Sequence, residues 1–203
     1  MMAASTSLRD RLLTVTTDLL AEQGVAAVSL REIARRAGVS HGAPLRHFPS
    51  LANLLAHVSA AGFRRLRQVI AAGAASAGPA APDRLAAALR AYCRFGLEQP
   101  GLLTLMFRWD LVDLNEPQLA ADSHGAFNDL VELVVAAQAQ GWHADLEPRR
   151  LAGVLWSAAH GLANLWAGDA VQRPTGATTL DELLDPLLTV LVGPELGAGR
   201  RSR

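Results

Sequence analysis

The sequence has no lysine, a single cysteine and no long apolar run. The lone Cys93 excludes an internal disulfide framework and a cysteine-rich zinc site, and we expect it to be a small buried hydrophobic residue. No stretch reaches the roughly 18 apolar residues that a membrane span needs. Charged side chains also interrupt the N-terminus where a secretory signal needs an apolar run. These absences predict a cytoplasmic protein with no membrane partner.

Motifs of common catalytic and metal sites are missing as well. The sequence contains no G-x-S-x-G, no phosphate-binding glycine loop, no dinucleotide fingerprint and no H-E-x-x-H. His41, His47 and His57 lie near one another in the sequence, but no carboxylate or cysteine joins them at ligand spacing. We therefore expect no metal and no cofactor. An enzyme acting on a small hydrophobic substrate is kept only as a remote alternative.

The net charge of zero hides an uneven distribution of charge. Up to Ile70, nine arginines face four acidic residues, which gives +5. The other ten arginines face fifteen acidic residues, which gives −5. A basic N-terminal third on an acidic body is typical of a polyanion-binding head joined to a separate domain.

Helical periodicity runs through nearly the whole chain, and no alternating strand pattern occurs. In the N-terminal part we expect a helix that starts at Leu8 and ends before Gly24, a second over 29–38, a short third starting at Ser40, and a fourth from Pro49 or Ser50 to Ile70. The Gly- and Pro-bearing stretch 71–82 is the best linker candidate. Further helices are expected at about 83–98, 101–109, 116–140, 148–168 and 180–192, with a loop over 173–179.

These elements predict an all-α fold. An N-terminal three-helix head is expected to be joined by a long fourth helix to a C-terminal helical domain of about five helices. The expected domains are a helical head over 1–55 and a helical body over 56–195, followed by a disordered tail over 196–203.

Residues 29–48 carry the clearest functional pattern, a helix-turn-helix around Gly38. Glycine at this turn can adopt a positive φ. The second helix of such a unit presents its N-terminal end to the major groove of DNA. The candidates for reading bases are His41, Gly42, Ala43, Arg46 and His47. The candidates for contacting the DNA backbone are Ser29, Arg31, Arg35 and Ser40.

The segment from about Arg9 to Leu55 resembles the TetR family of transcriptional regulators. The resemblance lies in AEQGVAAVSL at the end of the first helix and in REIARRAGVSHGAPLRHF after it. A weaker resemblance, in AYCRFGLEQPGLLTLMFR and LWSAAHGLANLWAGD, is to the C-terminal domain of a TetR subgroup named for its Trp-His-Gly signature. The resemblance implies a homodimeric regulator that binds an inverted-repeat operator in double-stranded DNA, typically a repressor that a small-molecule effector releases.

Two positions depart from the family's pattern. The family commonly has a tyrosine at the position of Leu45 and a lysine at the position of Leu51, and both usually contact phosphates. Each lost phosphate contact reduces the counterion release that drives DNA binding. We therefore expect weaker binding than is typical of the family at physiological salt.

Aromatic residues concentrate in the C-terminal body, where they fit either core packing or an apolar ligand pocket. The resemblance places the pocket in this domain. The lining candidates are Phe95, Met106, Phe107, Phe127 and Trp156, with His160 and Asn164 as polar groups. No dense cluster of charges occurs, so we expect a neutral or hydrophobic effector. The alternatives are a vestigial pocket or a protein partner.

The last two predicted helices are apolar over much of their surface, which is typical of an association site. Eight residues are candidates for a two-fold four-helix interface: Ala159, Leu162, Ala163, Trp166, Leu184, Leu187, Leu188 and Leu191. The alternative is that a preceding helix of the same chain covers this stripe.

Overall fold

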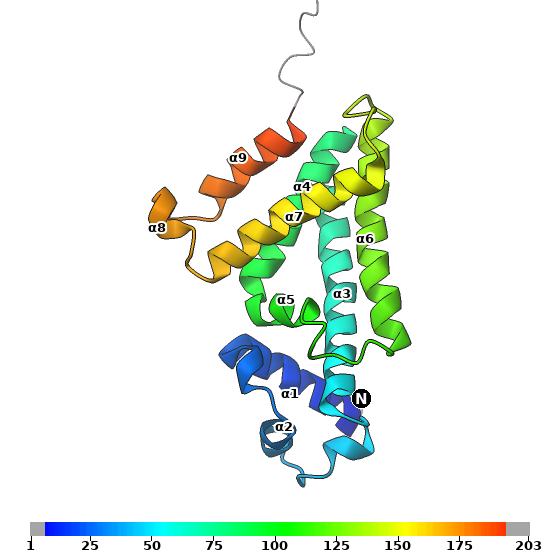
Figure 1. Ribbon diagram of the computed structural model, residues 1–203, viewed down its shortest axis with the longest axis vertical. Coiled ribbons are helices and arrows are strands. Elements are labelled where there is room, and N and C mark those ends of the chain that lie inside the picture. The colour runs from blue at the N-terminus through cyan, green and yellow to red at the C-terminus, as the bar shows by residue number, and fades with distance from the viewer. Residues whose placement is uncertain (1–6, 194–203) are drawn as a thin grey trace, which may run out of the picture. The chain divides into compact units, whose positions relative to one another are not determined.

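A computed structural model describes residues 7–193, which form nine α-helices, two short 3-10 turns and no strand (Figure 1). The predicted all-α fold is confirmed. None of these helices is long and apolar enough to cross a membrane. The predicted tail lies outside the described residues. The elements are α1 (Leu8–Gln23), η1 (Val25–Ala27), α2 (Leu30–Arg36), η2 (Pro44–Arg46), α3 (Leu51–Ser76), α4 (Ala81–Glu98), α5 (Pro100–Met106), α6 (Pro117–Gln138), α7 (Pro148–Ala167), α8 (Gln172–Thr175) and α9 (Asp181–Val192).

The helices gather into two compact units. Among the described residues, the first unit contains residues 7–65 together with Gln99–Gly125, and the second contains Leu66–Glu98 and residues 126–193. Helices α3 and α6 each contribute residues to both units. The first unit extends beyond residue 55, because it includes α3 up to Arg65 and also α5, which packs on α1.

The first unit is built on α1. The Ser7 hydroxyl caps this helix by accepting the Asp10 N–H at 3.1 Å, and Gly24 ends it with φ 73° and an N–H that donates to Leu20 O. Helix α5 approaches α1 backbone to backbone. A Cβ on Gly101 would lie 2.1 Å from Leu20 O, so only glycine fits at this contact.

The predicted third helix is wrong, because residues 40–47 form turns and the short η2 rather than an α-helix. Pro44 explains the difference. It has no N–H to donate to Ser40 O, so the first α-helical hydrogen bond cannot form. The Ala43 N–H donates to Ser40 O instead, at 2.9 Å, and the Arg46 N–H donates to Ala43 O at 3.1 Å. The segment therefore has the i→i+3 hydrogen bonds of a 3-10 turn.

The predicted linker over 71–82 is too long, because α3 continues to Ser76 and α4 begins at Ala81. Alanine is a strong helix former, and Gly73 lets α3 lie against α4. A Cβ on Gly73 would be 2.8 Å from the Cβ of Ala91. Two smaller differences occur further along the chain: the helix expected at 101–109 ends at Met106, and part of the loop expected at 173–179 forms the single turn α8.

Helix α4 is the centre of the second unit, since both α7 and α9 pack on it. Cys93, on α4, is fully buried as expected, and its thiol donates to Ala159 O of α7 at 3.5 Å. Burial raises the pKa of the Cys93 thiol to about 12, so the thiol is neutral at physiological pH.

Candidate nucleic-acid interface and effector region

Helix α2 and the turn that follows it form the base of the candidate nucleic-acid interface. Ser29 caps α2 by accepting the Glu32 N–H at 3.2 Å. On the inner face of α2, Ile33 and Ala34 are buried. Gly38 adopts φ 64°, as predicted, and the next N–H, that of Val39, donates to Ala34 O at 3.0 Å. This geometry turns the chain directly from α2 into the segment that carries the base-reading candidates.

The recognition turn, residues 40–47, rests on a fully buried aromatic ring. Phe48 is 0% exposed, with the Arg9 guanidinium 5.0 Å from its ring centroid. Ala43 is also buried, at 8% exposed, so it supports the turn and has little surface for a base contact. The other predicted residues of the turn are exposed to solvent: Ser40, His41, Gly42, Arg46 and His47.

The arginines of this region differ in how far they are already paired. Arg35 makes a two-pronged contact with the Glu32 carboxylate, at 2.8 and 2.6 Å. Arg36 donates to Glu32 of its own helix at 3.0 Å and to Glu22 of α1 at 2.5 Å, so it ties α2 to α1. Within residues 7–193, Arg31 makes no ion pair. Arg31 is therefore better placed than Arg35 to contact a phosphate.

Arg46 is the one arginine of the recognition turn. It is exposed, and it forms no ion pair with any described residue. Leu45 beside it is 51% exposed, so the residue that replaces the family's tyrosine presents an apolar side chain at the same surface. The backbone around both residues is held by the N–H of His47, which donates to Pro44 O at 3.0 Å.

The Glu32 ion pairs predict a pH dependence of stability. Hydrogen bonds from Arg35 and then Arg36 lower the pKa of Glu32 from 4.5 to about 2. Because the folded pKa is depressed, this contribution is fully present above pH 4.5 and is lost as the pH falls toward 2. We expect Glu32→Gln to flatten the decline of the unfolding free energy between these values, measured by urea denaturation. An unchanged decline in the variant would contradict this role of the pair.

In the second unit, a chain of polar side chains joins α4 to α7. The Trp156 indole N–H donates to the Tyr92 hydroxyl at 3.2 Å, and that hydroxyl lies 2.6 Å from Nδ1 of His160. Nε2 of His160 lies 2.7 Å from the side-chain amide of Asn164. Burial lowers the pKa of His160, which favours the neutral imidazole. Phe127 of α6 packs against Trp156, with ring centroids 5.9 Å apart.

The structure thus brings four of the seven ligand candidates together, namely Phe127, Trp156, His160 and Asn164. Sequence reasoning missed Tyr92, which links them, although it is the only tyrosine in the chain. Phe95 is buried on α4, where it lines a cavity of about 290 Å³ together with residues of α3 such as Val69.

The other two ligand candidates, Met106 and Phe107, belong to the first unit. The side chain of Met106 is buried against Gly62, where an added Cβ would lie 2.8 Å from its sulfur. The ring of Phe107 packs edge-on against Phe63, with centroids 5.6 Å apart. Across residues 7–193, no three His, Cys, Asp or Glu side chains are placed to hold a metal ion.

Half of the predicted dimer-interface residues are covered within the chain. Ala159, Ala163, Leu184 and Leu188 are buried, because α7 and α9 turn these residues inward in the unit built on α4. These four residues are therefore covered by helices of the same chain. Leu162, Trp166, Leu187 and Leu191 are partly exposed.

The outward faces of α7 and α9 carry apolar residues that sequence reasoning missed. Val154 and Leu165 of α7 are 57% and 51% exposed, and Val190 of α9 is 80% exposed. Val154 and Leu165 are eleven residues apart, a spacing that places them on one face of a helix. This spacing could have indicated a second apolar face on the helix. It does not show which of the two apolar faces is buried within the chain.

Two family models match the chain, one in each part. The model described as bacterial regulatory proteins of the tetR family matches residues 12–58, and the model of a tetracyclin repressor-like C-terminal domain matches residues 85–191. No curated protein shows a significant sequence match to the chain.

Solved structures are similar over nearly the whole chain. A protein of unknown function from Rhodococcus sp. RHA1 is 32% identical, with 93% of this chain and 95% of that chain covered and a TM-score of 0.81. The fatty acid degradation regulator FadR from Bacillus halodurans is 18% identical, with coverage of 99% and 100% and a TM-score of 0.72. The MbdR regulator from Azoarcus sp. CIB is 22% identical, with coverage of 92% and 97% and a TM-score of 0.68. The last two likenesses show the fold alone.

The C-terminal family model alone spans more than half of the chain, and the N-terminal model covers the helix-turn-helix described above. These two matches show that the chain belongs to the TetR family of bacterial transcriptional regulators, in which a DNA-binding head and a ligand-binding C-terminal domain are typically combined in a dimer.

Proposed function

We propose that this regulator is a repressor whose two heads read an inverted-repeat operator, and that a small, largely apolar ligand releases it. The observation that carries the proposal is the exposed recognition turn, which presents Arg46 together with His41 and His47. The buried ring of Phe48 supports this turn from below. Arginine is the commonest reader of guanine in the major groove. Arg31, which is exposed at the start of α2, would contact an adjacent phosphate.

The second copy of the chain would pack against the outward apolar faces of α7 and α9. Exposed Val154, Leu165 and Val190 supply the apolar surface, and the partly exposed Leu187 and Leu191 extend it. Gly161 has open space around its Cα, which would let a partner helix approach closely. Two-fold pairing of this face gives the two heads that an inverted repeat requires.

The ligand would bind beside the Tyr92–Trp156–His160 chain, with the aromatic rings as apolar walls and the polar atoms to orient it. A neutral His160 favours an uncharged or weakly polar effector over an ionic one. The ligand can release DNA only if it binds the DNA-incompetent arrangement of the dimer more tightly. Helix α3 offers a continuous connection, because it starts beside the recognition turn and ends in the second unit.

Arg46→Ala tests the interface. If Arg46 reads a base, the variant should lose about 1–3 kcal/mol of operator-binding free energy and tolerate substitutions at one operator position. Fluorescence anisotropy with an operator selected from random duplexes measures both effects. Arg173→Ala, which removes an exposed arginine from α8, is the matched control and should bind DNA normally. An Arg46→Ala variant that binds the operator as tightly as the unmodified protein would remove Arg46 from the site.

A further inference from the structure

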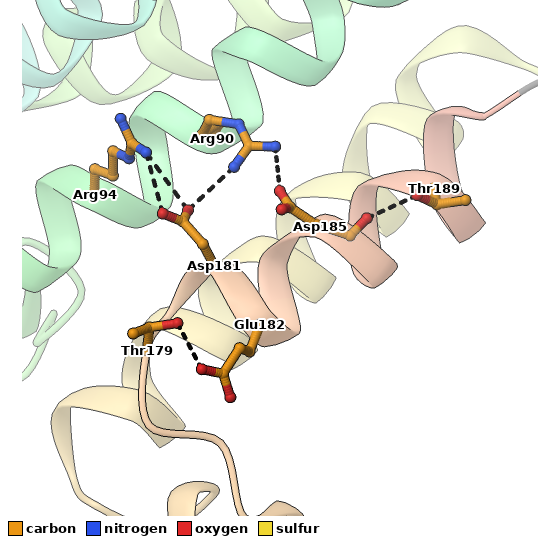
Figure 2. A network of polar contacts seen from close by, with 7 residues as sticks. All are labelled: Arg90, Arg94, Thr179, Asp181, Glu182, Asp185 and Thr189. Atoms are coloured by element: carbon orange, nitrogen blue, oxygen red, sulfur yellow. Dashed lines mark hydrogen bonds and ion pairs between the residues drawn. The ribbon is translucent and has the colours of Figure 1, made fainter.

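Two arginines of α4 form ion pairs with two aspartates of α9, and the residues of each helix are one turn apart. We call this set of ion pairs, formed by Arg90, Arg94, Asp181 and Asp185, the ladder. Asp181 accepts from Arg90 at 3.1 Å and from Arg94 at 3.3 Å, and Asp185 accepts from Arg90 at 2.5 Å (Figure 2). Arg90 and Arg94 are four residues apart on α4, as are Asp181 and Asp185 on α9. All four side chains are about one third exposed or more, so these pairs add little stability by attraction alone.

The apolar contact beneath the ladder does not determine where α9 sits along α4. The buried residues Leu180, Leu184, Leu188 and Val192 repeat every four positions. Sliding α9 by one turn, about 5.4 Å, therefore replaces one aliphatic side chain with another. The contact is also incomplete, because a groove of about 740 Å³ lies beside it, lined by residues of both helices such as Ala86 and Thr189.

The charged residues, in contrast, favour the observed position of α9 along α4, its register, over the positions one helical turn away in either direction. The helices run in opposite directions, since Asp185 shares the groove with Asp83 at the start of α4 while Asp181 pairs with Arg94 near its end. A slide of one turn in one direction moves Asp181 beside Glu98, the next residue four positions after Arg94. The opposite slide moves Asp185 toward Asp83. Each slide loses an ion pair and gains a repulsion between like charges.

We propose that this ladder fixes the register of α9 on α4 and thereby determines which face the protein presents to its second copy. Helix α7 also packs on α4, so α4 aligns both helices of the proposed interface. A slide of α9 would move exposed Val190 by one turn relative to Val154 and Leu165 of α7. Arg90, Arg94, Asp181 and Asp185 are thus positioning residues for dimerisation, an inference that rests on the dimer proposed above.

An exchange of two residues tests the register directly. In the Asp181→Thr, Thr189→Asp double variant, composition and net charge are unchanged, but the acid pair moves from 181 and 185 to 185 and 189. Arg90 and Arg94 can then both form ion pairs only if α9 slides by one turn toward Glu98. The threonine introduced at position 181 would lie beside Glu98 after this slide, and a neutral threonine is not repelled there. Asp181→Thr alone is the matched control, because it removes one acid and keeps Asp185 on Arg90.

Sedimentation equilibrium gives the dissociation constant of the dimer, and amide hydrogen exchange over residues 181–192 shows whether α9 stays docked. We expect the single variant to dimerise within about threefold of the unmodified chain. The double variant should dimerise at least about tenfold more weakly while its α9 amides stay protected. A double variant that dimerises like the single one, or whose α9 amides lose protection, would overturn the register role. A monomeric unmodified chain would instead contradict the proposed dimer.

Discussion

Gly101→Ala is expected to destabilise the first unit on the order of 3 kcal/mol, at the upper end of what overpacking costs. The added Cβ would lie 2.1 Å from Leu20 O, a backbone atom that already accepts a hydrogen bond from the Gly24 N–H. The carbonyl cannot move aside without disturbing the end of α1, so α5 must shift. Urea denaturation measures the loss of unfolding free energy, and operator binding should weaken with it.

Gly153→Ala is the control for this prediction. Gly153 lies inside α7 with nothing within 4 Å of an added Cβ, so alanine should stabilise the helix by about 0.5–1 kcal/mol. The same substitution is thus expected to act with opposite sign at the two glycines. If Gly101→Ala left stability unchanged, the close approach of α5 to α1 would be wrong.

Phe48→Ala is expected to cost about 3–5 kcal/mol, the usual range for a fully buried aromatic residue. The ring is 0% exposed and lies 5.5 Å from the His57 ring, centroid to centroid, as well as beneath Arg9. Removal of the ring takes away the packing that supports the recognition turn, so we expect operator affinity to be lost together with stability. Thermal unfolding followed by circular dichroism, with anisotropy for DNA binding, measures both.

Phe48→Leu separates packing from the aromatic contacts. Leucine refills most of the volume, so less than half of the stability loss should remain, and DNA binding should largely return. A Phe48→Ala protein that is as stable as the unmodified chain and still binds its operator would show that the turn is held by other contacts.

The sequence predicted the helices well, because helical spacing depends on the chain alone. The positive φ of Gly38 is also local, and it was predicted correctly. The caps at Ser7 and Ser29 are local features of the same kind. The predicted third helix does not form, and the reason is also local. An early proline is tolerated in a helix of normal length, but in a segment this short Pro44 removes the first of very few hydrogen bonds.

The sequence could not predict which other helix, or which second copy of the chain, covers each apolar helix face. Leu184 and Leu188 look like interface residues by spacing, yet α4 covers them, while Val190 faces outward. The same limit applies to the predicted linker. The sequence does not show that Gly73 packs against Ala91, because this contact depends on how α3 and α4 are arranged. Among the ligand candidates, Tyr92 joined His160 only through the packing of α4 on α7.

In the proposed release mechanism helix α3 would act as a lever arm, because it has no proline in its 26 residues and contributes residues to both units. At 1.5 Å per residue it is about 39 Å long, so turning it by about 5° around one end carries the other through about 3 Å. That displacement is the length of a whole hydrogen bond between a side chain and a base. In that mechanism, a tilt too small to unpack any core would decide whether the residues proposed to read bases reach them.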